Sequence, residues 1–488
     1  MLSAAIVGFL MLPYNLHHLG KEVYGISALA VSFVTMLEFL KLGFGPAMVR
    51  FFSEAVVNED KERLRKISST AQLLLGTLGL VGAMTILTLS HQFVVFYHIA
   101  DDVQNSVRQL LTCMAASTFF QFIGTTFSSI LMASGRYDYV NVFSMLKHWV
   151  LLLCLFVFYN SFGASLTLLG GAMLCAALFH FIAIGAAALW VQGRAVCFSP
   201  RYVSFALVPG LFSISILALI THTFCTLSIH VPLLIIGKTL GKEMVAAFAP
   251  GLLMASLLLS LLTHINNPMT PLASKDMLKN DGRNLAIWAT CFGQILACIG
   301  YGIIIMFVVF GQDMLRMWLG EDFVWITGVV TLLVVGTVYS GIQGPNYNLG
   351  LGASTIMPNA CSAVVMAVLT SIGTFLGTVY WEWGLLEVAA CIAIVRMVRN
   401  TVFLSWIYSK LLRYQYGIYF YKVYIKPAFG AVVLYAVVYL TQLVLPKTES
   451  SLPILLGEFA VYGLIYLGIV WTCGLSRETK VLIGVRAN

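Results

Sequence analysis

Residues 166–192 read LTLLGGAMLCAALFHFIAIGAAALWVQ, and this stretch contains no Asp, Glu, Lys or Arg. A helix of about 20 apolar residues crosses a hydrocarbon core of about 30 Å, because it satisfies its own backbone hydrogen bonds. Similar runs recur along the 488-residue chain, in which 60% of the residues are hydrophobic and 10% are charged. Soluble domains carry about 25% charged residues. The sequence therefore predicts a multi-pass integral membrane protein.

The spacing of the apolar runs predicts an all-α polytopic fold with about 14 transmembrane helices. Six spans fall in the first half of the chain, six in the second half, and a terminal pair follows. No polar interval is long enough to bury a core of its own, so no soluble domain is expected. The expected spans are residues 1–17, 25–52, 69–97, 106–133, 139–159, 166–192, 204–236, 244–268, 286–310, 325–349, 358–380, 385–412, 425–445 and 452–474.

A short motif occurs twice and indicates an internal repeat. The sequence LGKE at residues 19–22 recurs at residues 240–243, and Pro13 has a counterpart in Pro232 at nearly the same offset. An even number of spans in each half makes the two halves parallel, related by a pseudo-twofold axis along the membrane normal. Proline removes a helical hydrogen bond and bends the helix, so Pro13 and Pro232 are predicted hinges.

The repeat predicts three parts. These are an N-terminal six-helix lobe, a C-terminal six-helix lobe, and a terminal helix pair with a cytoplasmic tail, at residues 1–200, 201–415 and 416–488.

The distribution of basic residues predicts the orientation. With the N-terminus in the cytoplasm, seventeen Lys and Arg residues fall in cytoplasmic loops and six in the opposite loops. Positive charge is enriched on the cytoplasmic side of membrane proteins, so both termini are expected there. The net charge of +8 follows from this topology and does not indicate nucleic-acid binding. The chain has no N-x-[ST] sequon, which favours a bacterial plasma membrane.

Charged residues within the predicted spans are the candidate binding residues. Each ion costs at least about 2.5–3.5 kcal/mol at the bilayer centre, so such residues normally face the bundle interior or a wet cavity. The set is mostly basic and would attract a phosphate or pyrophosphate group. Arg50 and Lys147 could instead extend to the interface, and intramembrane Asn, Gln and His residues could join helices. The candidates are Glu38, Lys41, Arg50, Lys147, Arg396 and Arg399.

Other chemistry has little support in the sequence. The ten cysteines are scattered singly, with no C-x-x-C pair and no His at ligand spacing, so no metal site is expected. The GKT at residues 237–239 resembles the end of a phosphate-binding loop, but Pro232 stands where the loop needs glycine. The loops are too short to build a catalytic site. We expect no enzyme activity and no cofactor, with coupling to a proton or sodium gradient left open.

Several short patches resemble one family of transporters. Residues 18–25 (HLGKEVYG), 42–51 (LGFGPAMVRF) and 60–64 (DKERL) resemble the opening of O-antigen flippases of the polysaccharide-transport family. The sequence RMWLGE at residues 316–321 resembles the outer-loop motif of that family. The likeness covers the whole chain in span number and repeat, and these patches in detail.

The resemblance implies a function as well as a fold. It implies the fold of the multidrug/oligosaccharidyl-lipid/polysaccharide (MOP) superfamily, with two six-helix lobes around a central cavity. The implied substrate is a polyprenyl-pyrophosphate-linked oligosaccharide, a repeat unit of O-antigen, capsule or exopolysaccharide, carried to the periplasmic leaflet by alternating access. Membrane lipids, a polysaccharide polymerase and chain-length proteins are the implied partners. The alternative is a cation-coupled multidrug antiporter, which predicts a cavity rich in Asp and Glu.

Overall fold

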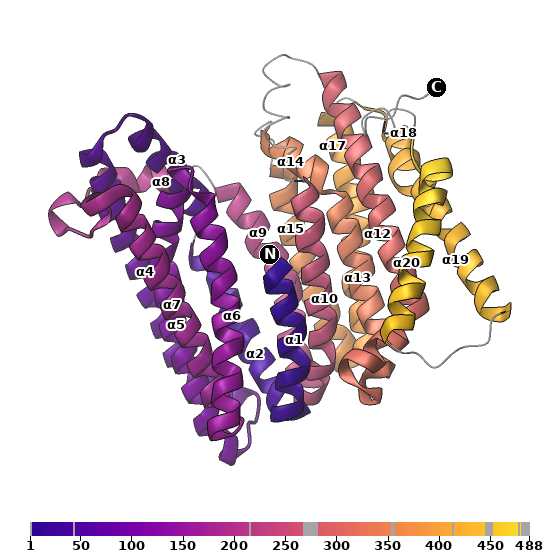
Figure 1. Cartoon of the computed structure of the whole chain (residues 1–488), viewed down its shortest axis with the longest axis horizontal. Coiled ribbons are helices and arrows are strands. Elements are labelled where there is room, and N and C mark those ends of the chain that lie inside the picture. The colour runs from indigo at the N-terminus through magenta and orange to yellow at the C-terminus, as the bar shows by residue number, and fades with distance from the viewer. Residues whose placement is uncertain are drawn as a thin grey trace. The chain divides into compact units, whose positions relative to one another are not determined.

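The protein is helical throughout the part of the chain that the computed structural model describes (Figure 1). Twelve helical stretches in that part are long and apolar enough to cross a membrane, and a shorter apolar helix covers Gly457–Thr472. The predicted all-α polytopic fold class is therefore confirmed. The described residues are 2–41, 44–213, 216–266, 282–352, 357–411, 414–444, 452–476 and 479.

The chain divides by compactness into two units. Unit 1 comprises Met1–Ala246 and unit 2 comprises Ala247–Asn488. The boundary falls inside helix α10 (Lys242–Asn266). This division is based on the contacts between residues. The predicted lobe boundaries near residues 200 and 415 are based on the sequence repeat, and they stay a prediction.

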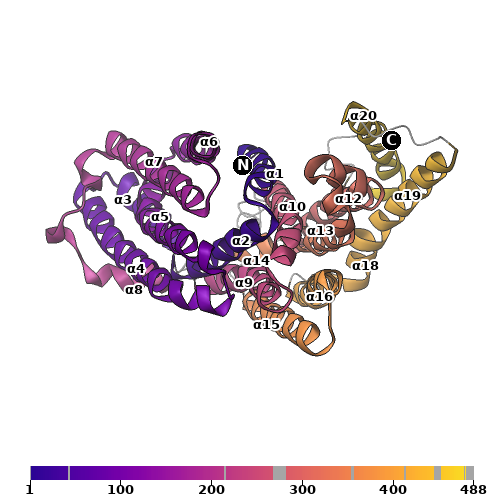
Figure 2. The same cartoon turned by 90° about the horizontal axis from the view of Figure 1, so that it is seen from below.

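Unit 1 is a bundle arranged around α5 (Asp101–Ala133). This helix packs against α7 (Leu166–Gln192), α4 (Lys61–Phe96) and α3 (Phe44–Val57), and Figure 2 shows it between α4 and α7. At the other side of the unit, two further pairs of helices pack together. These pairs are α1 (Leu2–Leu19) with α6 (Tyr137–Phe162), and α2 (Lys21–Met36) with α9 (Ile216–Thr239). The remaining elements are η1 (Leu37–Lys41), η2 (Gly193–Val196), η3 (Pro200–Tyr202), η4 (Phe205–Leu207) and α8 (Val208–Ser213).

Small residues let the helices of unit 1 approach closely. A Cβ added at Gly170 of α7 would lie 3.0 Å from the Cα of Leu110 on α5. In lipid, packing and small residues replace the hydrophobic effect as the force that joins helices. Near α3, Phe52 and Phe122 are fully buried in the same apolar cluster. These contacts hold α5 in the centre of the unit.

The second predicted span is not one continuous helix. The structure divides it into α2, the 3-10 helix η1 and α3, and residues 42–43 lie outside the described part. Glycine disfavours a helix interior, and Gly43 and Gly45 flank the start of α3. Pro46 falls in the first turn of α3, where its missing N–H costs no helical bond. The Gly-Pro sequence thus starts a new helix, which the apolar pattern alone did not separate.

Both copies of the LGKE motif form the same kind of turn. Gly20 joins α1 to α2 with φ +78°, and Gly241 joins α9 to α10 with φ +99°. Glycine populates this left-handed region without a steric penalty. In both copies of the motif the glycine therefore has a positive φ and connects two helices.

Unit 2 is built around α12 (Gly282–Leu319) and α13 (Thr327–Ile342). Helix α13 packs on α16 (Leu385–Val398), and α12 packs on both α13 and α19 (Lys426–Val444). Three short segments are π-helical, a conformation with i→i+5 hydrogen bonds that is frequent at functional sites. They are η6 (Arg399–Leu404), η7 (Tyr421–Ile425) and η8 (Val470–Gly474). The other elements are η5 (Glu321–Ile326), α14 (Gly344–Gly352), α15 (Met357–Tyr380), α17 (Ser405–Leu411), α18 (Tyr416–Phe420) and α20 (Leu452–Ile469).

A buried amide ties α12 to the C-terminal segments of unit 2. Gln294 Nε2 donates to the carbonyls of Lys422 at 3.0 Å and Gly474 at 2.8 Å. Its Oε1 accepts from Ser476 N at 3.0 Å and from Thr479 Oγ1 at 2.7 Å. One fully buried side chain thus pairs four groups from different parts of the sequence.

Replacing Gln294 with leucine should destabilise the protein by about 2 kcal/mol, because four interhelical hydrogen bonds at about 0.6 kcal/mol each are lost. The measurement is the midpoint of thermal unfolding in detergent. Gln312→Leu, an exposed position on the same helix, should leave the midpoint unchanged. Equal midpoints for both variants would contradict the role given to Gln294.

Candidate functional site

A pocket of about 220 Å³ lies in unit 1 between α2, α5, α6 and α7. Sites for drug-sized ligands measure about 300–1,000 Å³, so this pocket suits a head group rather than a whole oligosaccharide. It is lined by Val34, Met114, Ser117, Thr118, Gln121, Lys147, His148, Leu151, Met173 and Ala176.

The charge of the pocket comes from α6. Lys147 and His148 line it, whereas no Asp or Glu occurs among its lining residues in the described part of the chain. Lysine presents three N–H donors and no acceptor. The lining as described therefore favours an anion over a cation.

His148 has one ring nitrogen committed to the backbone. Its Nδ1 lies 2.7 Å from the carbonyl oxygen of Ser144. A carbonyl only accepts, so Nδ1 carries the hydrogen, and Nε2 is the atom that gains or loses a proton. The hydroxyl of Ser144 lies 3.5 Å from Nε2 of His180, which joins α6 to α7. His148 is thus oriented by its own helix turn.

The two hydroxyls in the pocket were not predicted as site residues. Ser117 and Thr118 donate to the carbonyls of Cys113 and Met114, each at 2.8 Å, one turn earlier in α5. With these hydrogens used, the hydroxyl oxygens offer lone pairs only. Donors to an anion must therefore come from the amine of Lys147 and the amide of Gln121, and from Nε2 of His148 only when that ring is protonated. The only sequence signal for the hydroxyls was their position inside a span.

The predicted residues of unit 1 differ in their placement. Lys41 ends η1, and its Nζ lies 5.5 Å from the ring centroid of Phe122, the residue after Gln121 of the pocket. Lys41 and Lys147 therefore both approach the middle of α5. Arg50 is exposed on α3 and does not line the pocket. The side chain of Glu38 lies outside the described part of the structure.

The two predicted arginines of unit 2 point to different helices. Arg396, at the end of α16, is 5% exposed and donates to Thr337 Oγ1 on α13 at 3.3 Å. Arg399 begins the π-helix η6 and donates from Nε to Ser362 Oγ on α15 at 3.0 Å. It also donates to the carbonyl of Asn359 at 3.3 Å. Their role as substrate ligands stays a prediction.

A buried polar network surrounds the arginines in unit 2. Gln343 Oε1 accepts from Asn346 Nδ2 at 3.3 Å and from Tyr424 OH at 3.4 Å. Ser405 Oγ, at the start of α17, lies 3.2 Å from the same oxygen and donates its single hydrogen to the nearer carbonyl of Asn400 in η6, at 2.8 Å. Interhelical hydrogen bonds of this kind join helices in lipid. The network joins Gln343, between α13 and α14, to α14, η6, α17 and η7.

The two predicted hinge prolines lie inside helices. Pro13 is within α1 and Pro232 within α9. Nothing in the geometry of a single conformation tests a hinge, so this role stays a prediction.

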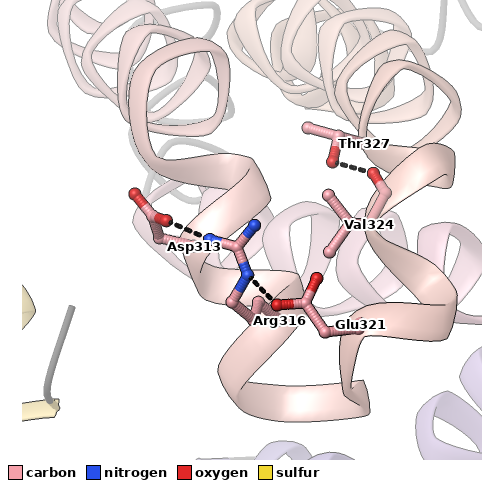
Figure 3. Close-up of polar contacts among 5 residues, drawn as sticks. All are labelled: Asp313, Arg316, Glu321, Val324 and Thr327. Carbon is pink, nitrogen blue, oxygen red and sulfur yellow. Dashed lines mark hydrogen bonds and ion pairs between the residues drawn. The ribbon is translucent and has the colours of Figure 1, made fainter. Parts of the chain in front are cut away.

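The RMWLGE motif forms a charged turn between α12 and η5 (Figure 3). Arg316 donates from one guanidinium nitrogen to Asp313 at 2.9 Å and from Nε to Glu321 at 2.6 Å. Gly320 between them has φ +92°, and Thr327 Oγ1 donates to the carbonyl of Val324 at 2.6 Å. The motif therefore fixes the turn through local bonds.

Comparison with known proteins leads to transporters. The family model MatE matches residues 5–158. The structure of an inward-facing multidrug resistance MATE family transporter of the MOP superfamily has a TM-score of 0.73 at 14% identity, covering 85% of this chain and 96% of that one. Lipid II flippase MurJ, in an inward closed conformation, has a TM-score of 0.73 at 14% identity, covering 96% and 97%. An outward-facing MATE family transporter has a TM-score of 0.65 at 14% identity, covering 85% and 95%. A search of curated proteins finds no significant match.

The chain has the all-helical fold of transporters of the MOP superfamily. Within that fold the similar structures include both multidrug transporters and a lipid flippase, and they do not single out the O-antigen flippases. The solved structures with this fold that are named above are membrane transporters and a flippase.

Arg399→Met should lower the stability of the protein by about 1–2 kcal/mol, because its bonds to α15 are lost from a partly buried site. Arg316→Met, which breaks two exposed ion pairs, should cost about 0–1 kcal/mol. Thermal unfolding in detergent compares the two variants. A larger loss for Arg316→Met would contradict the structural role of Arg399.

Proposed function

We propose that the protein is a flippase for a polyprenyl-pyrophosphate-linked oligosaccharide in a bacterial plasma membrane. The observation that carries the proposal is the pocket of unit 1, with the amine of Lys147 and the amide of Gln121 among its lining residues. A pyrophosphate accepts hydrogen bonds and carries negative charge, so it matches this set of donors.

The size of the pocket indicates that only the head group of the substrate would enter it. A volume of about 220 Å³ suits the pyrophosphate and its nearest groups. The polyprenyl tail would stay in the bilayer, where it costs no desolvation. Lys147 would hold the head group, with Lys41 adding positive charge beside Phe122 of α5. Arg396 and Arg399 would bind substrate only in a conformation in which bonds to the substrate replace their present bonds to Thr337 and Ser362.

The extent of the structural likeness also favours this reading. The match to the flippase MurJ covers 96% of the chain, whereas the matches to the MATE transporters cover 84–85%. A polyprenyl-linked substrate fits both the likeness of the fold to a lipid flippase and the basic lining of the pocket. Translocation would follow alternating access between the two sides of the membrane.

The second candidate is a cation-coupled multidrug antiporter. It is favoured by the match of the MatE family model to residues 5–158. Such an antiporter needs acidic groups for its cations, and the described lining of the pocket in unit 1 supplies basic ones. We therefore place the flippase first.

Lys147→Met should slow flipping of a polyprenyl-pyrophosphate-linked oligosaccharide in proteoliposomes by about tenfold or more. A hydrogen bond to a charged group contributes about 1.5–3 kcal/mol, and 1.4 kcal/mol corresponds to a factor of ten. Lys147→Arg keeps the charge and should retain part of the rate. The assay measures how fast the labelled sugar becomes accessible to an added enzyme on the opposite side.

The matched control is Lys66→Met. Lys66 lies on α4 and forms an exposed ion pair with Glu62 at 2.7 Å, so its loss should leave the rate unchanged. A wild-type rate in Lys147→Met would remove the pocket from the substrate path. Gradient-driven efflux of a cationic dye, with no flipping of any lipid-linked oligosaccharide, would favour the antiporter instead.

A further inference from the structure

A lysine of α9 holds the turn that follows α4. Lys238 Nζ donates to the carbonyl of Phe96 at 2.7 Å and lies 4.7 Å from the ring centroid of the same residue. Its third contact is Nε2 of His98, at 3.0 Å. Next to these bonds, Tyr97 OH donates to the carbonyl of Leu234 at 3.2 Å. The α4–α5 turn of unit 1 is therefore fastened to α9 through two side chains.

A second lysine joins the same turn to α2. Lys242 Nζ, on the first residue of α10, lies 3.0 Å from Glu22 Oε1 and donates to the carbonyl of His98 at 3.2 Å. Glu22 and Lys242 come from the two copies of the LGKE motif. The turns that the repeat predicts to be equivalent thus meet each other at one end of unit 1. We refer to Glu22, Phe96, His98, Lys238 and Lys242 as the His98 cluster.

Gly25 of α2 allows the turn between α9 and α10 to pack directly against α2. A Cβ added at Gly25 would lie 1.9 Å from the carbonyl oxygen of Lys242, a backbone atom that no rotamer change can move. His98 itself has φ +47°, a region that residues other than glycine seldom adopt. The hydrogen bonds of His98 to Lys238, Lys242 and Val95 keep it in this conformation.

The bond between Lys238 and His98 sets the protonation state of the imidazole. An ammonium group has donors only, so Nε2 of His98 must accept, and the ring must be neutral with its hydrogen on Nδ1. A second proton would turn Nε2 into a donor and bring two cations to 3.0 Å. His98 is exposed, so protons reach it from solvent. Acid therefore acts directly on this contact.

We propose that the His98 cluster is a proton-sensitive latch, which holds the α4–α5 turn against the α9–α10 turn when His98 is neutral and releases it when His98 is protonated. The proposal goes beyond the transport function and does not depend on the substrate. The titratable and charged groups around the latch are Lys21 and Glu22 on α2, Tyr97 before α5, Asp101 and Asp102 on α5, Lys238 on α9, and Lys242 and Glu243 on α10.

Hydrogen–deuterium exchange of the full chain in lipid nanodiscs tests the latch. Peptides that cover residues 94–104 report on the turn, where the amides of His98 and Ile99 bond to the carbonyls of Val95 and Val94. After correction for the intrinsic effect of pH, these amides should exchange about threefold or more faster at pH 5.5 than at pH 7.5, because local opening exposes them. Equal corrected rates at the two pH values would overturn the proposal.

Variants separate His98 from other titrating groups. In His98→Gln the amide oxygen still accepts from Lys238 and carries no charge, so exchange should be slow at both pH values. His98→Lys should be fast at both, and Lys238→Met should lose the pH dependence. His17→Gln, an exposed histidine of α1, is the matched control and should behave as wild type. A pH dependence that survives in His98→Gln would overturn the proposal, and Lys238→Met provides the same test if His98→Gln does not fold.

Discussion

Inside a bilayer no water is present to pair with a buried polar group, so each one must find its partner within the protein. Unit 2 shows how this constraint is met where the helix is irregular. The carbonyl of Asn400, inside the π-helix η6, accepts from Ser405 Oγ at 2.8 Å. Tyr424 OH approaches the same oxygen at 3.4 Å. Hydroxyl groups from neighbouring segments therefore contribute to the hydrogen bonding of the irregular turn.

The two units use their polar residues differently. In unit 2 the arginines of α16 and η6 donate to side chains and carbonyls of adjacent helices. In unit 1 the hydroxyls of the pocket bond to their own helix, and the side of the pocket formed by α6 carries Lys147. Polar groups join helices in both units, but in unit 1 Lys147 also borders a pocket that a ligand can enter. This pocket is the physical basis for proposing a head-group site in unit 1.

The sequence predicted the helical, membrane-spanning fold because the apolar runs are long and nearly free of charge. It did not predict the division of the second span, since hydropathy continues across Gly43 and Pro46 while helix propensity does not. Lys147 was predicted as a binding residue because a charge inside the bilayer is energetically costly, and in the structure it lines a pocket. The same argument grouped Arg396 with Arg399, but their spacing of three residues could not reveal that one faces α13 and the other α15. Partners distant in sequence decide such directions, and periodicity contains no information about them.

The bonds of Gln294 also bear on how the protein is made. A ribosome delivers α12 to the membrane long before residues 422, 474, 476 and 479, which supply all four partners of this amide. During that interval the amide of Gln294 must remain hydrated or form hydrogen bonds with other groups, because an unpaired amide in hydrocarbon is energetically costly. Final assembly of this part of the molecule must therefore wait until synthesis of the chain has passed residue 479. This part of the bundle is therefore among the last to reach its final hydrogen bonding.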